Sequence, residues 1–301
     1  MSTMPKKVLV SEVCPRDGWQ NHPVPIPAQT KIKYIKKMVD CGARKMEITS
    51  FVNPKYVPQM GDAREVYAGV KDYLDENGVT AFALTLNKHG VEDARAAGFH
   101  HVEFVLSASE EHNIRNSRCT IRESLDAFKA LAQEAKDLHI ILAMPCIFGS
   151  PFGDEVPLDR IKWLIDEAES VGVAEFGVAD TAGISNPENT RRVLAAVKDY
   201  TDINKVSLHM HDTYGMGLAN VYAALEEGVT MMDSSLAGMG GCPFAPGAKG
   251  NIATEDLLYM LHDTGIETGY DLNKLNHVAA EMAAEVQFLP TSCQSSLCKQ
   301  H

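Results

Sequence analysis

Short apolar and β-branched runs alternate with longer amphipathic segments along this chain. The runs predict β-strands at residues 7–13, 45–51, 79–85, 101–108, 139–146, 174–180, 205–211 and 230–236. Between and after them, apolar residues three and four positions apart predict helices, at residues 28–42, 64–78, 90–98, 120–138, 158–172, 187–200, 218–228 and 254–265. The chain is therefore a row of eight strand–helix units.

This order of elements selects a fold class. Strands that alternate with helices pair in parallel through right-handed crossovers. Eight such units in 301 residues predict an α/β fold, a closed (β/α)8 TIM barrel. An open doubly wound sheet is the alternative, but it usually has a glycine fingerprint after its first strand, where this chain has "CPRDGWQN". We predict a catalytic barrel over residues 1–265 and a C-terminal helical extension over 266–301, packed on the barrel.

The composition narrows the classes of partner. Hydrophobic residues make up 45% of the chain and charged residues 23%, which is ordinary for a folded soluble protein. There are 28 basic against 40 acidic residues, a net charge of −12. Nucleic acids and anionic membranes require a basic surface, so we expect neither as a partner. An anionic small molecule stays possible, because a local pocket can oppose the net charge.

The cysteines indicate a reducing compartment. Seven are scattered along the chain without any CxxC pair, so a zinc ribbon or a thioredoxin-type motif is unsupported. Such scattered thiols are typical of reduced cytosolic proteins. The first residues have too short an apolar run for a signal peptide, and no stretch has the length needed to cross a bilayer. We predict a cytoplasmic protein.

Polar side chains gather where the predicted strands end. In TIM barrels, catalytic groups lie at the carboxyl ends of the strands and in the loops that follow. At these positions the chain has Arg16, Asp17, Glu47, Asp180, His209 and His211, and a glycine-rich loop with Cys242 and Asn251 follows the eighth strand. One mouth of the barrel is thus expected to be polar and charged.

His209 and His211 are candidate metal ligands. Residues at i and i+2 on a strand share a face, so both rings can point into the barrel mouth. Alone, such a pair is more often two core histidines bonded to backbone. Asp17 at the same end of the barrel favours a metal, because two imidazoles and a carboxylate suit a divalent ion with open positions. Asn251 adds a fourth ligand, its carbonyl oxygen.

Each of the other candidates has a functional and a structural interpretation. Arg16, beside a metal-bound carboxylate, can hold a developing oxyanion, or it is an ion pair at the rim. Cys242 can deliver a proton from a loop that closes over the site, or it is a small residue in a surface loop. Glu47 and Asp180 can orient the arginine or a ligand, or they are strand-end charges in water.

Five long motifs resemble one enzyme family. They are "EVCPRDGWQN", "EITSFVNPKYVPQMGD", "GVADTAG", "HMHDTYGMGLAN" and "DSSLAGMGGCPFAPGAKGNIATEDLLYML". Together, and in this order from the first strand to about residue 265, they resemble 3-hydroxy-3-methylglutaryl-CoA lyase. The "GGCPFAPGAKGN" loop distinguishes this branch from the related isopropylmalate and homocitrate synthases.

The resemblance implies a metal-dependent retro-Claisen cleavage to acetyl-CoA and acetoacetate. It implies magnesium or manganese on Asp17, His209, His211 and Asn251, and an active site that also contains Arg16, Glu47, Asp180 and Cys242. His209 or Asp17 is placed as the base. We expect an acyl-CoA substrate and a homodimer or higher homo-oligomer. A Claisen-type synthase that condenses acetyl-CoA with a 2-oxo acid, and a non-catalytic metal-binding barrel, are the alternatives.

Two departures from the family lie beside the Arg–Asp pair. The family opening usually has glycine where this chain has Cys14, and leucine where it has Trp19. We expect the larger indole to change the shape of the acyl pocket. The alternative is that Trp19 points away from the site and packs behind the loop.

Overall fold

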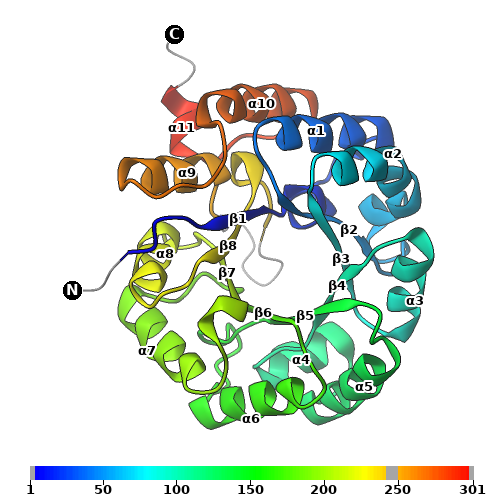
Figure 1. Ribbon diagram of the computed structural model, residues 1–301, viewed down its shortest axis with the longest axis vertical. Coiled ribbons are helices and arrows are strands. Elements are labelled where there is room, and N and C mark those ends of the chain that lie inside the picture. Colours follow the sequence, from blue (N-terminus) through cyan, green and yellow to red (C-terminus); the bar gives the residue numbers. More distant parts are fainter. Residues whose placement is uncertain (1–3, 242–249, 298–301) are drawn as a thin grey trace.

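The computed structural model, which describes residues 4–241 and 250–297, closes eight parallel strands into one barrel (Figure 1). Each strand pairs with the next along the chain, and the last pairs back with the first. The strands are β1 (Leu9–Glu12), β2 (Lys45–Phe51), β3 (Thr80–Thr85), β4 (His101–Val105), β5 (His139–Met144), β6 (Glu175–Asp180), β7 (Val206–Met210) and β8 (Met231–Ser234). The predicted TIM barrel is confirmed.

The helices lie outside the strands (Figure 1). They are α1 (Ala28–Asp40), α2 (Ala63–Glu76), α3 (Lys88–Ala97), α4 (Glu110–Ser117), α5 (Ile121–Glu134), α6 (Leu158–Glu169), α7 (Pro187–Lys198), α8 (Gly217–Glu226), α9 (Thr254–Asp263), α10 (Leu272–Glu285) and the short α11 (Cys293–Leu297). Within residues 4–241 and 250–297, no helix combines the length and apolar composition needed to cross a membrane.

Helix α5 illustrates why these segments fold as they do. Its side chains at positions 121, 125, 128 and 132 are buried, which is the three- and four-residue spacing of one helical face. Thr120 accepts from the backbone N–H of Glu123, whose carboxylate accepts in return from the N–H of Thr120. This capping box fixes the first turn. The helix is thus specified both along its face and at its start.

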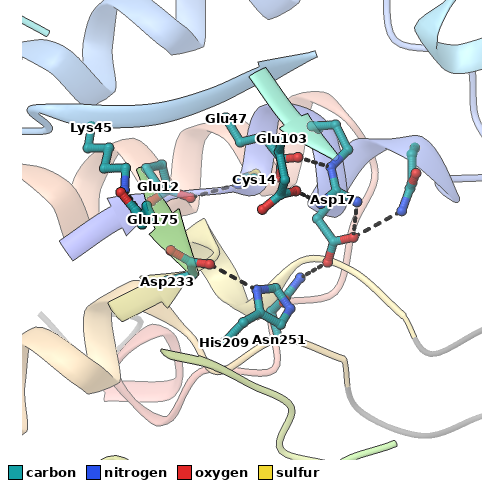
Figure 2. A network of polar contacts seen from close by, with 12 residues as sticks. Glu12, Cys14, Asp17, Lys45, Glu47, Glu103, Glu175, His209, Asp233 and Asn251 are labelled. Atoms are coloured by element: carbon teal, nitrogen blue, oxygen red, sulfur yellow. Dashed lines mark hydrogen bonds and ion pairs between the residues drawn. The ribbon is translucent and has the colours of Figure 1, made fainter. Parts of the chain in front are cut away.

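The barrel interior contains a buried ion pair at its amino-terminal end. Lys45 at the start of β2 contacts Glu175 at the start of β6, and both side chains are almost fully buried (Figure 2). Two adjacent rings, His101 on β4 and His139 on β5, lie beside it with centroids 4.5 Å apart. Polar groups therefore continue through the barrel below its mouth.

The helical C-terminal segment lies against the start of the barrel. Helix α10 packs on α1 and α9 (Figure 1), and Lys33 of α1 pairs with Glu285 at 2.7 Å. Nε2 of His22 lies 2.7 Å from the carbonyl oxygen of Val286, just after α10. The division of the chain at residue 265 stays a prediction.

Glu12, at the end of β1, joins three parts of the chain. One of its oxygens accepts from the backbone N–H groups of Cys14 and Leu236, at 2.9 Å each. The other accepts from the hydroxyl of Thr254 at 2.8 Å. Burial raises the pKa of Glu12 to about 8, against the lowering effect of these donors. This carboxyl therefore connects β1, the segment after β8 and the first turn of α9.

We expect Glu12→Ala to lower the free energy of unfolding by about 3 kcal/mol, because two buried N–H groups lose their acceptor. Chemical denaturation measures the change. Glu76→Ala, at an exposed position of α2, is the control and should stay within about 0.5 kcal/mol of the wild type. An equal effect of the two substitutions would contradict the role of Glu12.

Two buried acids should make a contribution to stability that falls as pH rises from 5 to 8. Burial raises the pKa of Glu12 to about 8 and that of Glu255 to about 7, from an ordinary 4.5. Between these values the two carboxyls bind more protons in the folded chain than in the unfolded chain, so their contribution to the free energy of unfolding decreases with pH. In Glu255→Gln, which cannot titrate, the decrease should be smaller. An unchanged slope in denaturation curves at pH 5 and 8 would rule this out for Glu255.

Candidate active site

A five-residue π-helix, η1 (Cys14–Gly18), carries the first two site residues. The backbone N–H groups of Arg16, Asp17 and Gly18 all point to the carbonyl oxygen of Val13, so β1 ends and the chain turns over the mouth of the barrel. Gly18 is required here, because a β-carbon would lie 2.9 Å from Oγ of Ser235. The observed strand, Leu9–Glu12, is shorter than the predicted 7–13, and at its end Val13 already caps η1 in a conformation that is not extended.

Arg16 lies buried among three carboxylates. Its Nε donates to Glu47, its Nη1 donates to Asp17 at 2.7 Å, and its Nη2 lies 3.7 Å from Oε2 of Glu103. Burial alone would lower the Arg16 pKa, but the carboxylates, Glu47 first, outweigh it and raise the pKa. The guanidinium is therefore a permanent charge in this site.

Glu47 comes to the arginine from an irregular part of β2. Pairing with β3 shifts between Glu47 and Thr49, so one extra residue is accommodated there. Such bulges re-aim side chains next to active sites. Burial raises the pKa of Glu47 although Arg16 opposes the effect.

Asp17 connects the arginine to the other side of the mouth. Its Oδ1 accepts from Arg16 and from Nε2 of Gln20, and its Oδ2 accepts from Nδ2 of Asn251 at 2.6 Å (Figure 2). Burial raises the Asp17 pKa, but Arg16 and then the two histidines prevail and lower it to about 2. Asp17 is thus ionised at neutral pH, as a metal ligand must be.

The two histidines project from the end of β7. Nδ1 of His209 lies 3.3 Å from Oδ2 of Asp233, its neighbour on β8 (Figure 2). Burial lowers the His209 pKa, but Asp233 outweighs it and the net shift is upward. The pKa of His211 is instead lowered to about 4, by burial first and then by His209. His211 is therefore a neutral imidazole, the form that binds metals.

Asp17, His209 and His211 form a possible metal site. One ligand atom of each lies within 4.8 Å of the others. Nδ1 of His211 and Oδ1 of Asn251 are buried and lack a hydrogen-bond partner within residues 4–241 and 250–297. Buried polar atoms are normally bonded, and a cation bound between these residues would give such atoms a partner. The residues present fit a divalent cation.

Glycines bring Asn251 to this cluster. A β-carbon on Gly250 would lie 2.5 Å from the carbonyl carbon of Gly240, so the two limbs of the glycine-rich loop touch at its base. A β-carbon on Gly240 would lie 2.4 Å from Nδ2 of Asn251. Asn251 also forms a bridge with His211 through the backbone. The spacing of these glycines therefore has a local steric reason.

Three polar partners in the site were not among the predicted residues. Glu103 on β4 approaches Arg16, Asp233 on β8 bonds His209, and Gln20 bonds Asp17. Both acids interrupt strongly apolar strands, and this feature of the sequence could have marked them as site residues. Gln20 has no such signal.

Asp180 lies near enough to His209 for their charges to interact, but its carboxylate bonds to the loop that follows β6. Its two oxygens accept from the backbone N–H groups of Ile184 and Ser185, at 3.1 and 2.9 Å. The carboxylate thus fixes the loop after β6, rather than contacting Arg16. Cys242 lies outside the described residues.

The expectation that the indole of Trp19 shapes the acyl pocket is wrong, because the indole does not reach the pocket. The indole is fully buried in the core and does not line the pocket. Cys14 is also fully buried, and its Sγ lies 3.9 Å from Sδ of Met282 on α10. The two departures therefore pack behind η1, as in the alternative interpretation.

A pocket of about 1330 Å³ opens at the mouth of the barrel. It begins at Arg16, Asp17 and the two histidines and extends outward over β2, β3 and α4. Arg64, Arg115 and Arg118 line it together with Asp62, Glu65 and Asp93, and Arg64 pairs with Asp93 at 2.7 Å. The pocket thus joins the charged cluster to an outer groove that carries charges of both signs.

The fold and this cluster define an α/β barrel enzyme with a possible divalent metal site. The HMGL-like family model matches residues 7–282, and the chain belongs to this family. A hydroxymethylglutaryl-CoA lyase of Bacillus subtilis is 40% identical over 273 residues, with 90% of each chain covered. A Pseudomonas aeruginosa lyase named for 3-hydroxy-3-isohexenylglutaryl-CoA and hydroxymethylglutaryl-CoA is 39% identical over 274 residues, also with 90% of each covered.

Solved structures agree. The HMG-CoA lyase of Bacillus subtilis superposes with a TM-score of 0.94 at 38% identity, and 99% of each chain is covered. An HMG-CoA lyase of Acinetobacter baumannii, in complex with coenzyme A and 3-methylmalate, has a TM-score of 0.92 at 33% identity, covering 98% of this chain and 96% of that one.

We expect His211→Ala to weaken the binding of Mn²⁺ at least ~100-fold, because removing a ligand costs more than disturbing its supporting shell. Titration calorimetry with Mn²⁺ measures this without an activity assay. His262→Ala is the control, since His262 lies in the last turn of α9, bonds Thr268 and is not part of the metal cluster. Equal affinity in the two variants would exclude His211 as a ligand.

Proposed function

We propose that this protein is a metal-dependent carbon–carbon lyase that cleaves 3-hydroxy-3-methylglutaryl-CoA, or a close relative of it, to acetyl-CoA and a 3-oxo acid such as acetoacetate. The observation that carries the proposal is the junction of Arg16 and Asp17 with His209 and His211 at the base of the pocket. It combines a fixed cation, a metal-binding set and an imidazole in one place.

The reaction requires two proton movements around one bond cleavage. The tertiary hydroxyl loses its proton, and the bond between the carbinol carbon and the CH₂ next to the thioester carbonyl breaks. The electron pair of that bond forms the enolate of the acetyl thioester, which then takes a proton on carbon. Asp17, His209, His211 and Asn251 would hold Mg²⁺ or Mn²⁺, and this ion supplies acidity to the hydroxyl and orients the substrate.

His209 is the proposed base. Asp233 holds its Nδ1, so Nε2 takes the proton, and in this step the ion would be held by Asp17, His211 and Asn251. The side chain is 16% exposed at the end of β7, and Asp233 next to it orients the ring through Nδ1. Asp233 also raises the pKa of His209 against the effect of burial. An imidazole fixed by a carboxylate is a typical general base. Asp17, whose pKa is lowered to about 2, is a poorer proton acceptor.

Arg16 is the proposed stabiliser of the enolate oxygen. Glu47 and Asp17 accept from its Nε and Nη1, whereas among the described residues its Nη2 has only the distant Glu103, at 3.7 Å. This N–H edge is available to an oxyanion in the pocket. Because the guanidinium is held before the reaction begins, little reorganisation is needed as charge develops. Cys242 stays the candidate acid for the carbon, by family resemblance.

Two arginines in the outer groove suit the phosphates of a coenzyme A chain. Arg115 stacks on Phe152 with its guanidinium carbon 4.4 Å from the ring centre, and Arg118 follows at the end of α4. A pocket of this volume exceeds what a six-carbon acyl group fills. We propose that the acyl end lies at Arg16 and the phosphates lie toward these arginines. A cytoplasmic location and a homo-oligomer stay predictions from the sequence.

Release of acetyl-CoA from 3-hydroxy-3-methylglutaryl-CoA tests the proposal. We expect activity to disappear in protein dialysed against a chelator and to return with Mg²⁺ or Mn²⁺. Arg16→Gln should lose about 100-fold in kcat, or ~3 kcal/mol, with a smaller change in KM. Mn²⁺ titration of this variant separates a lost oxyanion donor from a lost metal site.

The outcomes distinguish the alternatives. A non-catalytic barrel releases no acetyl-CoA under any condition. A synthase instead consumes acetyl-CoA when a 2-oxo acid is supplied. Full activity after chelation would contradict the metal requirement, and near-normal turnover of Arg16→Gln would make Arg16 a structural ion pair only.

A further inference from the structure

The side of the pocket formed by β5 and β6 has almost no side-chain bulk. Ala143 on β5 and Gly177 on β6 are direct neighbours in the sheet, and Ala179 is the neighbour of His209. All three residues line the pocket. Small residues next to the proposed base leave space there for part of the acyl group.

One carboxyl group extends over this wall. Glu103 comes from β4, and a β-carbon placed on Gly177 would lie 3.6 Å from its Oε1. Its Oε2 points the other way, toward Nη2 of Arg16 at 3.7 Å. The side chain is about one-tenth exposed, and it lines the pocket. Glu103 thus has one oxygen facing the arginine and the other facing the space above Gly177.

The reaction as proposed gives Glu103 no task. Glu47 and Asp17 already hold Arg16 at hydrogen-bonding distance, whereas 3.7 Å from Glu103 is an ion-pair contact too long for a hydrogen bond. Glu103 also shares a hydrogen bond with Glu47. A carboxyl oxygen can accept more than one hydrogen bond, so the oxygen above Gly177 can also accept one from a hydroxyl on the bound substrate.

We propose that Glu103 selects the branch on the carbinol carbon of the substrate. The space above Ala143 and Gly177 accommodates a branch larger than methyl, and Oε1 of Glu103 accepts a hydrogen bond from a hydroxyl on that branch. The preferred class is then a hydroxyalkyl-substituted 3-hydroxyglutaryl thioester. An acidic branch is disfavoured, because Asp233 adds a second negative charge near Glu103. This inference rests on the proposed lyase function and specifies its substrate.

Three substrates test it, differing only in the branch: methyl, ethyl and hydroxymethyl. Ethyl and hydroxymethyl have nearly the same size, so the ratio of their kcat/KM values reports the hydrogen bond. We expect the wild type to favour hydroxymethyl over ethyl about 10-fold or more, since a site that bonds a hydroxyl rejects the analogue lacking it. In Glu103→Met, which keeps the length and removes the acceptor, the preference should disappear.

Gly177→Ala is the matched control for size. Its β-carbon would make ordinary contacts of 3.4 Å or more, so the fold should tolerate it. The added methyl group narrows the wall beside Glu103 and leaves the carboxyl in place. We expect ethyl and hydroxymethyl substrates to lose activity together relative to methyl, with their ratio unchanged.

Each result decides the matter. A wild type that does not favour hydroxymethyl over ethyl overturns the inference, as does a Glu103→Met variant that keeps the preference. If Glu103→Met is inactive on all substrates, Glu103→Gln decides: a uniform loss with an unchanged ratio means that Glu103 only positions Arg16. Absence of acetyl-CoA from all three substrates with the metal-loaded wild type refutes the proposed function itself.

Discussion

The charge of one buried arginine holds this site together. Arg16 neutralises carboxylates that reach it from three elements, η1, β2 and β4. Removing a buried guanidinium from water is costly, and only such partners compensate for it. The reverse also holds, because three acids this close would repel one another without the arginine. The turn after β1, the bulge in β2 and the register of β4 must therefore all be correct at once.

Closure of the barrel makes the second half of the site possible. Asp17 and Asn251 are 234 positions apart in the chain, yet their side chains are bonded. They meet because β8 pairs with β1, and because Gly240 and Gly250 let the loop after β8 touch itself at its base. Glu12 stabilises the same junction from beneath, through Leu236 and Thr254. Fold and site thus depend on the same contact between the two ends of the barrel.

Features that repeat regularly along the chain, or that depend on two residues close in sequence, could be predicted. Strands and amphipathic helices repeat regularly, and an HxH pair on a strand must share a face. The η1 turn has no period, so its helical form was not predicted, although Arg16 and Asp17 within it were named as site residues. Asp180 was placed at the correct strand end, but sequence does not show that the next loop turns two N–H groups toward it. The direction of Trp19 was equally undetermined, since burial of an indole depends on the packing behind η1.

The count of charges supports a cation beyond Arg16 at this site. Three acids, Asp17, Glu47 and Glu103, contact the guanidinium at the barrel mouth, and a fourth, Asp233, bonds His209. Without a further cation, burial raises the pKa of Glu47 and brings that of Glu103 to about 7, so protons supply the missing charge. A divalent cation at Asp17 and the two histidines would supply it instead, and would favour the ionised form of these acids. The surplus of buried carboxylates is thus an electrostatic argument for the metal, independent of the geometry of the ligands.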